Sequence, residues 1–297
     1  MKWGIAIGLL VVALVGYLFW PNDESQNEPP PPAPVVQADP RMDIIGRSVE
    51  GRAIESYTFG RGATRLLLVG GVHGGYEWNS VALAYRVIDE LKANPALLPA
   101  ALTATVIPVL NPDGLYRVIG QEGRFSVAAV PADEAQTIPG RFNAHQVDLN
   151  RNFDCKWQAE GQWRGQVVSG GTAPFSEPEA QALRDFVLAA KPAGVVLWHS
   201  QANAVYGSEC EHGVLPETLK IMNSYATAAG YPAIASFTAY PVAGDVEGWL
   251  AAIGIPAITV ELKTHQTIEW EQNWAGVKAL FEYYRLRDVS PARLPLS

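Results

Sequence analysis

The sequence predicts an α/β fold, in which strands and helices alternate along the chain. From about Arg41 onward, short apolar and β-branched runs alternate with longer segments of helical periodicity. The chain has 297 residues, 48% of them hydrophobic and 18% charged, which suits one large domain with a substantial core. We find no internal repeat.

Four short apolar runs predict strands, because a helix of ordinary length needs a longer periodic pattern. These strands are 65–70 (RLLLVG), 102–110 (LTATVIPVL), 194–198 (GVVLW) and 256–260 (PAITV). The predicted helices are 79–94, 177–190, 217–230 and 274–286. Ser176 with Glu179 fits a capping box before the second helix, and Gly230 fits a C-terminal stop for the third.

The N-terminus carries eighteen uncharged residues, 3–20, which would extend roughly 27 Å as a helix, about the thickness of a bilayer core. The run is longer than the apolar part of a signal peptide and has no small-residue cleavage site, so we expect a transmembrane signal anchor at 1–20. The alternative is a cleaved signal and a secreted protein. Lys2 before the run, with Asp23 and Glu24 after it, predicts a domain outside the cytoplasm, either periplasmic or on the cell surface.

The remaining organisation follows from composition. Residues 21–40 are expected to form a Pro-rich acidic linker, 41–290 one globular domain, which we expect to be monomeric, and 291–297 a tail. The formal net charge is -8 without a basic run, which argues against nucleic acid as a partner. Cys155 and Cys210 are an even pair in an extracytoplasmic chain, so we expect a disulfide; two buried thiols are the alternative.

Polar side chains follow each of the four predicted strands. Ligands of open α/β sheets bind at the carboxyl ends of the strands, so these side chains are expected to converge on one edge. They are His73 and Glu77, Asn111 and Asp113, His199, and Glu261.

Two histidines and one carboxylate are a protein ligand set for catalytic zinc, which keeps a fourth position open for water and lowers the pKa of that water. His73, Glu77 and His199 can supply these ligands for one Zn²⁺ per chain. Glu261 ends an apolar strand, where an unpartnered carboxylate would be costly, and can serve as the base.

Ordered motifs between Gly46 and Glu282 resemble the zinc metallocarboxypeptidase family. They are HGGYE (73–77), NPDG (111–114), RFN (141–143), VDLNRNF (147–153), SEPE (176–179), HS (199–200), Tyr240 and VEL (260–262). The resemblance implies a mixed, roughly eight-stranded central sheet with helices on both faces. It also implies a zinc peptidase whose substrate is a peptide or a murein peptide, and the N-terminal run would anchor this enzyme to the membrane.

The resemblance implies a role for each matching residue. His73, Glu77 and His199 would bind zinc, Glu261 would be the general base, and Arg141 would stabilise the oxyanion. Asn150 and Arg151 would hold the terminal carboxylate of the substrate, Tyr240 would close over it, and Asp148 would orient His73. His145, His212 and His265 are not assigned to zinc.

Two features depart from the family pattern. Three residues separate His73 from Glu77 where the family has two, and we expect the glycines to absorb the extra residue. The position seven residues after Tyr240 is Glu247, with Asp245 nearby, and an acid in this pocket favours a cationic substrate end. That end would be a C-terminal Lys or Arg, or the amino group of diaminopimelate. The alternative is that Glu247 faces solvent.

The sequence therefore predicts a zinc carboxypeptidase that hydrolyses a C-terminal peptide bond or a γ-D-glutamyl-diaminopimelate murein bond. One alternative is a deacylase of the aspartoacylase type that acts on N-acyl amino acids. Another is a catalytically inactive module that binds the cell wall.

Overall fold

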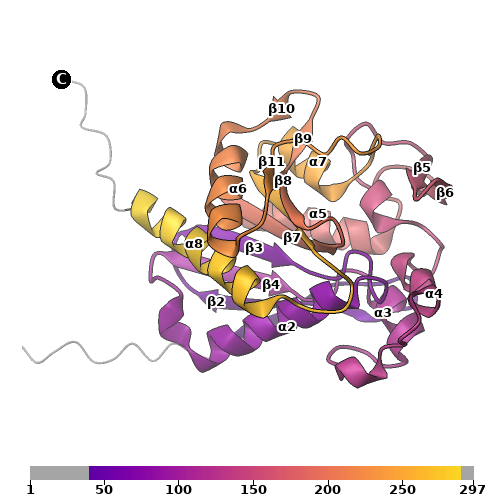
Figure 1. Ribbon diagram of the computed structural model, residues 1–297, viewed down its shortest axis with the longest axis horizontal. Coiled ribbons are helices and arrows are strands. Elements are labelled where there is room, and N and C mark those ends of the chain that lie inside the picture. The colour runs from indigo at the N-terminus through magenta and orange to yellow at the C-terminus, as the bar shows by residue number, and fades with distance from the viewer. Residues whose placement is uncertain (1–39, 289–297) are drawn as a thin grey trace, which may run out of the picture. The chain divides into compact units, whose positions relative to one another are not determined.

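The computed structural model describes residues 40–288 and is built around an eight-stranded mixed sheet (Figure 1). The strand order is β1-β2-β4-β3-β7-β12-β8-β11. The strands are β1 (Arg41–Arg47), β2 (Ala53–Gly60), β3 (Thr64–Val69), β4 (Leu102–Ile107), β7 (Gly194–Ser200), β8 (Ala204–Gly207), β11 (Ala233–Ile234) and β12 (Ala257–Leu262). The predicted fold class and sheet are confirmed.

The four predicted strands form the centre of the sheet. β4, β3, β7 and β12 are neighbours and run parallel, so their carboxyl ends lie along one edge. β1 and β2 pair antiparallel with their neighbours, whereas β8 pairs antiparallel with β12 and parallel with β11. The strand expected at 102–110 stops at Ile107, and the segment after it leads into a helix.

Helices cover both faces of the sheet, because successive central residues point to opposite sides. On one face, Leu66 and Leu68 of β3 belong to the core that contains residues of α2, α6 and α8. On the other face, Leu67 and Val69 pack in the core that includes residues of α5 and α7. Figure 1 shows α8, coloured yellow, beside α6. The parallel strands are thus buried on both sides.

The four predicted helices are present. They are α2 (Trp78–Ala93), α5 (Pro178–Ala190), α6 (Pro216–Ala229) and α8 (Trp270–Asp288). Gly230 ends α6 in the left-handed conformation, with a φ of +73°, as predicted. The predicted capping box is wrong, since the N-cap of α5 is Glu177 and it makes no side-chain cap. The carboxylate of Glu179 instead accepts from the backbone N–H of Val49 and from Asn143.

Shorter elements were not predicted. The additional α-helices are α3 (Pro112–Ile119), α4 (Glu134–Thr137) and α7 (Val246–Ala252). The 3₁₀ helices are η2 (Pro95–Leu97), η3 (Val127–Ala129), η4 (Ile138–Arg141) and η5 (Leu149–Arg151). Two hairpins lie outside the main sheet, one of β5 (Glu160–Trp163) and β6 (Gln166–Ser169), the other of β9 (Glu209–Cys210) and β10 (Gly213–Val214). Several of these elements contribute to the site.

The predicted membrane-anchored location is corrected. Among residues 40–288, no helix is both long enough and apolar enough to cross a membrane. The anchor expected at 1–20 and the linker expected at 21–40 lie outside the described residues, apart from Pro40, and so does the whole tail expected at 291–297.

Candidate active site

His73 and Glu77 lie in the loop that joins β3 to α2, and Glu77 is the residue that begins the helix. The three intervening residues form a tight turn, in which the backbone N–H groups of Tyr76 and Glu77 point to the carbonyl of His73 at 3.0 and 3.4 Å. Gly74 has a φ of +44°, and a Cβ there would lie only 2.8 Å from the Gly140 carbonyl oxygen. Glycine is therefore needed for the turn that brings Glu77 back to His73.

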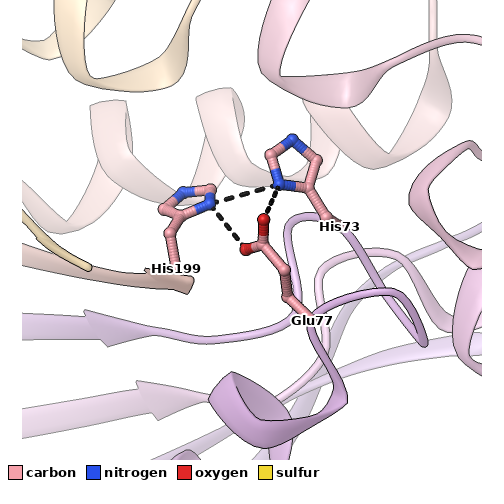
Figure 2. A group of neighbouring side chains, drawn as sticks. All are labelled: His73, Glu77 and His199. Carbon is pink, nitrogen blue, oxygen red and sulfur yellow. Dashed lines mark hydrogen bonds and ion pairs between the residues drawn. The ribbon is translucent and has the colours of Figure 1, made fainter. Parts of the chain in front are cut away.

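His73, Glu77 and His199 point toward one another from two segments of the chain (Figure 2). Nδ1 of His73 lies 2.8 Å from Oε1 of Glu77, and Nδ1 of His199 lies 2.9 Å from Oε2. The two Nδ1 atoms are 3.3 Å apart. All three side chains are buried, and one ligand atom from each lies within 4.8 Å of the others.

This donor set fits zinc. Zinc in catalytic sites takes two histidine nitrogens and a carboxylate oxygen. Here both imidazoles direct the same ring atom, Nδ1, at the carboxylate of Glu77. Burial alone would raise the pKa of Glu77, but His73 and His199 hold the pKa below its usual range, so the carboxylate stays ionised. Three lone-pair donors facing one small buried volume are the arrangement that a divalent cation stabilises.

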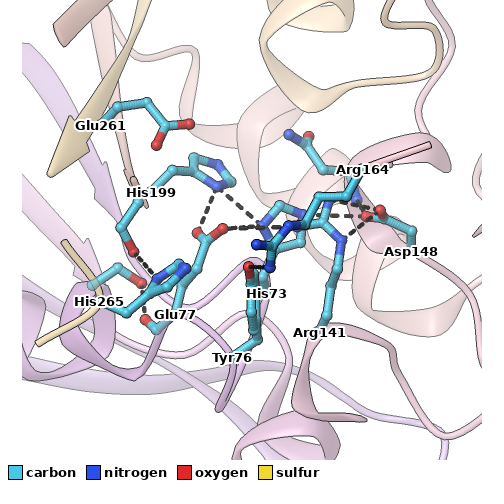
Figure 3. Close-up of polar contacts among 12 residues, drawn as sticks. His73, Tyr76, Glu77, Arg141, Asp148, Arg164, His199, Glu261 and His265 are labelled. Carbon is cyan, nitrogen blue, oxygen red and sulfur yellow. Dashed lines mark hydrogen bonds and ion pairs between the residues drawn. The ribbon is translucent and has the colours of Figure 1, made fainter. Parts of the chain in front are cut away.

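Asp148 lies behind His73 and connects it to Arg141 (Figure 3). Oδ1 of Asp148 is 3.2 Å from Nε2 of His73 and also accepts from the backbone N–H of Asn150 at 3.0 Å. Oδ2 accepts from Nε and Nη2 of Arg141 at 3.0 and 2.8 Å. Burial would raise the pKa of Asp148, but Arg141 and His73 hold it well below the usual value. One ionised carboxylate therefore orients both the expected ligand and the expected oxyanion donor.

Arg141 lines the cavity, and one of its guanidinium nitrogens, Nη1, takes no part in the hydrogen bonds to Asp148. Nη1 lies 3.8 Å from Oε1 of Glu77, which is too long for a hydrogen bond. The guanidinium also lies over the ring of Trp163, with Cζ 4.5 Å from the ring centroid. Asp148 and Trp163 thus hold Arg141 from two sides, and Nη1 remains for a substrate oxygen.

Glu261 lies on β12 in register with His199 on β7. Figure 3 shows Glu261 on the opposite side of His199 and Glu77 from Arg141. Its Oε2 accepts from the backbone N–H of Ala202 at 3.2 Å. Burial, followed by the charge of Glu77, raises the pKa of Glu261 to about 7. A carboxylate with a raised pKa is a stronger proton acceptor, as a general base requires.

One cavity of about 490 Å³ collects almost all of the predicted site residues. Its lining includes His73, Glu77, Arg141, Asn150, Arg151, His199, Tyr240, Asp245, Glu247 and Glu261. Asp148 lies behind this wall, fully buried. Asn111 and Asp113 do not line the cavity: Asn111 caps α3 through the N–H of Gly114, and Asp113 bonds Ser48. The predicted convergence at the strand ends is therefore confirmed for three of the four segments.

Asn150 and Arg151 occupy the cavity wall that lies next to α7. The guanidinium of Arg151 donates to the carbonyls of Asn150 and Gln162 at 2.6 and 3.0 Å. Its Nε is buried and makes no hydrogen bond with the described part of the chain. The amide oxygen of Asn150 accepts from the N–H of Val246 at 2.9 Å, which ties this wall to the start of α7.

Glu247 and Asp245 form the floor of the cavity. Glu247 does not face solvent, since it is 5% exposed, and its Oε1 accepts from the hydroxyl of Thr259 at 3.0 Å. Asp245 caps α7 by accepting from the N–H of Gly248 at 2.8 Å. Burial and the neighbouring Glu247 raise the pKa of Asp245 to about 6. Tyr240 lies on the rim, 39% exposed, with its ring against Phe237.

A disulfide joins Cys155 to Cys210, as predicted, with the two Cα atoms 6.1 Å apart. Both cysteines pack with Ala251 of α7. A Cβ at Gly248 would lie only 2.8 Å from the sulfur of Cys155. The bridge therefore connects the segment after Arg151 to the hairpin beside the floor of the cavity.

Some cavity residues were not predicted from the sequence. Trp163 and Arg164 come from the β5–β6 hairpin, and Tyr76 is one of the three residues between His73 and Glu77. The ring of Tyr76 contacts Trp163 edge-on, with the centroids 5.2 Å apart, and also packs against His265. Nη1 of Arg164 lies 3.4 Å from the Tyr76 hydroxyl. The only signal in the sequence was the extra residue itself.

Comparisons with known proteins agree with this geometry. The zinc carboxypeptidase family, peptidase family M14, matches residues 38–276. A gamma-D-glutamyl-L-diamino acid endopeptidase 1 from Lysinibacillus sphaericus is 27% identical over 259 residues, which cover 77% of this chain and 61% of that protein. This chain thus spans about three-fifths of the length of that relative.

Solved structures show the same fold. The murein-tripeptide amidase from Escherichia coli O157 has a TM-score of 0.57 and 25% identity, covering 86% of this chain and 95% of that one. Bovine thrombin-activatable fibrinolysis inhibitor, solved with a tick carboxypeptidase inhibitor, has a TM-score of 0.65 and 19% identity, covering 84% and 92%. The chain belongs to the zinc carboxypeptidase family, whose members are metallohydrolases that act on peptide bonds.

Proposed function

We propose that this protein is a zinc-dependent carboxypeptidase that releases a C-terminal residue with a cationic side chain, and that its substrate is a murein peptide ending in diaminopimelate. The observation that carries the proposal is the convergence, on one cavity, of a His-Glu-His ligand set, a carboxylate with a raised pKa, two arginines and two floor carboxylates. Each part matches one need of the reaction.

The ligand set would hold one zinc ion through Nδ1 of His73, Nδ1 of His199 and the carboxylate of Glu77. When bound, the ion would polarise the scissile carbonyl and acidify a water molecule. Glu261 would take the proton from the attacking water and deliver it to the leaving nitrogen. Arg141 would donate from Nη1 to the carbonyl oxygen as negative charge develops there.

The C-terminal end of the substrate would bind to the cavity wall that lies next to α7 and to the floor. Arg151 and Asn150 would hold the terminal carboxylate, for which a planar guanidinium is well suited. Tyr240 on the rim would close over the bound residue. Glu247, with Asp245 beside it, would receive an ammonium or guanidinium group at the floor.

Diaminopimelate satisfies both sets of contacts, because it carries a carboxylate on the carbon next to the scissile nitrogen and a free amino group at its distal end. Two relatives support this choice by their names: a gamma-D-glutamyl-L-diamino acid endopeptidase and a murein-tripeptide amidase. A C-terminal Lys or Arg peptide offers the same cation on an ordinary α-peptide bond. The substrate panel described next separates the two.

The test is mass spectrometry of products from the purified full-length chain with zinc. The substrates are L-Ala-γ-D-Glu-meso-diaminopimelate, α-peptides that end in Lys, Arg or Leu, and N-acyl amino acids; Glu261→Gln is the control. Release of diaminopimelate by the wild-type chain alone is expected. Release of only Lys or Arg would overturn the murein substrate, and turnover of only N-acyl amino acids would indicate a deacylase. A zinc-loaded chain that hydrolyses nothing would indicate a binding module.

A further inference from the structure

The second metal histidine has a carboxylate behind it, as the first one does. Oε1 of Glu247 lies 3.3 Å from Nε2 of His199, and Oδ1 of Asp148 lies 3.2 Å from Nε2 of His73. In both histidines the opposite ring atom, Nδ1, faces Glu77. Each imidazole is thus placed between Glu77 and a carboxylate on its far side.

A second observation, besides this distance, connects His199 to Glu247. Its Nε2 is fully buried and makes no aligned hydrogen bond with any residue of the described chain. A buried ring N–H without an acceptor is costly, so a carboxylate oxygen at 3.3 Å is its natural partner. Glu247 itself is only 5% exposed, so its carboxylate is not free to turn into solvent.

The position of Glu247 is fixed from two elements. The hydroxyl of Thr259 on β12 donates to the same Oε1 at 3.0 Å. The start of α7, which carries Glu247, is held by the bond from the N–H of Val246 to Asn150 and by the Asp245 cap. Both contacts of Oε1 are made without a substrate, so a substrate cation would meet Oε2.

We propose that Glu247 is a positioning residue for the metal site, which acts through Nε2 of His199, in addition to its role as a floor residue. A carboxylate on the remote nitrogen of a ligand histidine fixes its tautomer and ring orientation, and its loss typically weakens metal binding by about 10- to 100-fold. The inference rests on the proposed function for the identity of the metal, but not for the substrate. One side chain then links the end of the substrate to the geometry of the metal.

The two roles need different properties of residue 247. Receiving a cation requires a negative charge, whereas positioning His199 requires an oxygen that accepts a hydrogen bond. Glu247→Gln removes the charge and keeps such an oxygen, while Glu247→Met has similar size and removes both. Asp245→Asn is the matched control, because it removes a charge from the same floor and keeps a residue that caps helices well, and Asp245 makes no hydrogen bond or ion pair with either histidine within residues 40–288.

The experiment measures zinc affinity of the full-length variants by competition with a chromophoric chelator. Glu247→Met is expected to bind zinc about 10- to 100-fold more weakly, Glu247→Gln within about tenfold of wild type, and Asp245→Asn like wild type. Unchanged affinity in Glu247→Met would overturn the inference, as would an equal loss in Asp245→Asn. The substrate proposal would survive either result, whereas a wild-type chain that binds no zinc would remove the proposed function first.

If Glu247→Met does not fold, the same measurement is made on Thr259→Val. This variant leaves the carboxylate of Glu247 but removes the hydroxyl that donates to its Oε1. Loss of one such hydrogen bond is expected to weaken zinc binding roughly three- to tenfold. Unchanged affinity in a folded Thr259→Val chain would then overturn the inference. Circular dichroism of both variants establishes whether they are folded.

Discussion

The side of the cavity that carries the expected metal ligands, here called the metal wall, differs from the floor in how its negative charges are balanced. On the metal wall, Asp148 is paired with Arg141 and with His73, and Glu77 with both histidines. On the floor, burial and the charge of Glu247 raise the pKa of Asp245, whereas His199 outweighs burial and lowers the pKa of Glu247. No salt bridge within residues 40–288 pairs either carboxylate with Lys or Arg. The metal wall thus balances its carboxylates with Arg141 and the two histidines, while on the floor Glu247 has His199 beside it and Asp245 has no ion-pair partner among residues 40–288.

This difference indicates which wall defines the reaction and which defines the substrate. The metal wall resembles what any zinc peptidase needs, and it is built from the ends of central strands. The floor is built from α7 and the disulfide-linked segments, which lie outside the central strands, together with Thr259 of β12. The predictions below separate the two walls, beginning with the largest expected effect.

Removal of the metal should abolish hydrolysis altogether. We expect a strong chelator to take activity to background and stoichiometric zinc to restore it, because no other described group of the cavity replaces the ion's charge. The unfolding temperature should also fall, since a ligand at 1,000 times its Kd stabilises a fold by about 4 kcal/mol. Activity assays and thermal melts, with and without zinc, check this. Full activity after exhaustive chelation would contradict the metal assignment.

Glu261→Gln should lower kcat by roughly 10²- to 10⁴-fold, the usual contribution of a general base. The amide can still accept the bond from Ala202, so zinc content and KM should change little. Steady-state kinetics combined with metal analysis distinguish this result from a lost metal site. A variant that retains kcat would show that another group accepts the proton.

Removal of the disulfide should loosen the floor and spare the metal wall. Cys155→Ser with Cys210→Ser is expected to lower the free energy of unfolding by about 2–4 kcal/mol, because the bridge closes a long loop of 55 residues in sequence separation. KM should rise, since the bridge packs against Ala251 of α7, and zinc affinity should fall less than in Glu247→Met, because Thr259 still holds Glu247. Denaturant unfolding and chelator competition test both halves. A loss of zinc affinity as large as that in Glu247→Met would show that the bridge also sets the position of Glu247.

Glu247→Gln should change selectivity more than catalysis. The ratio of kcat/KM between a substrate end with an ammonium group and a neutral end of equal length should fall roughly 10- to 100-fold, the value of a hydrogen bond to a charged group. The matched comparison is Asp245→Asn, for which we expect a smaller change because that carboxylate is already committed to the helix cap. Equal selectivity in wild type and Glu247→Gln would show that Glu247 does not select a cationic substrate end.

The sequence was sufficient to predict the parts that depend on strong local patterns. The buried central strands are continuous apolar runs, and polar residues at their ends converge because parallel strands share one edge. The edge strands β1 and β11 were missed because their exposure is mixed or high, so the apolar pattern that marks a strand is weak there. The sheet order likewise depends on pairings between distant segments.

The errors of the sequence reading have physical causes. Ser176 and Glu179 have the spacing of a capping box, but other partners take both: Ser176 donates to the neighbouring Glu177 and accepts from Asn152, and Glu179 accepts from Val49 and Asn143. The contact between Trp163 and Arg141 joins positions 22 residues apart through a small hairpin, which no local pattern encodes. The link from Glu247 to His199 likewise requires the packing of α7 against the sheet.

The most direct test of the central claim compares two substrates that differ by one amino group. The purified zinc-loaded chain is given L-Ala-γ-D-Glu-meso-diaminopimelate and the same tripeptide ending in L-2-aminopimelate, which keeps both carboxylates and lacks the distal amine. We expect cleavage at the γ-glutamyl bond in both, with kcat/KM roughly 10- to 100-fold higher for diaminopimelate. Equal rates, or no cleavage of either tripeptide by a zinc-loaded chain, would contradict the account.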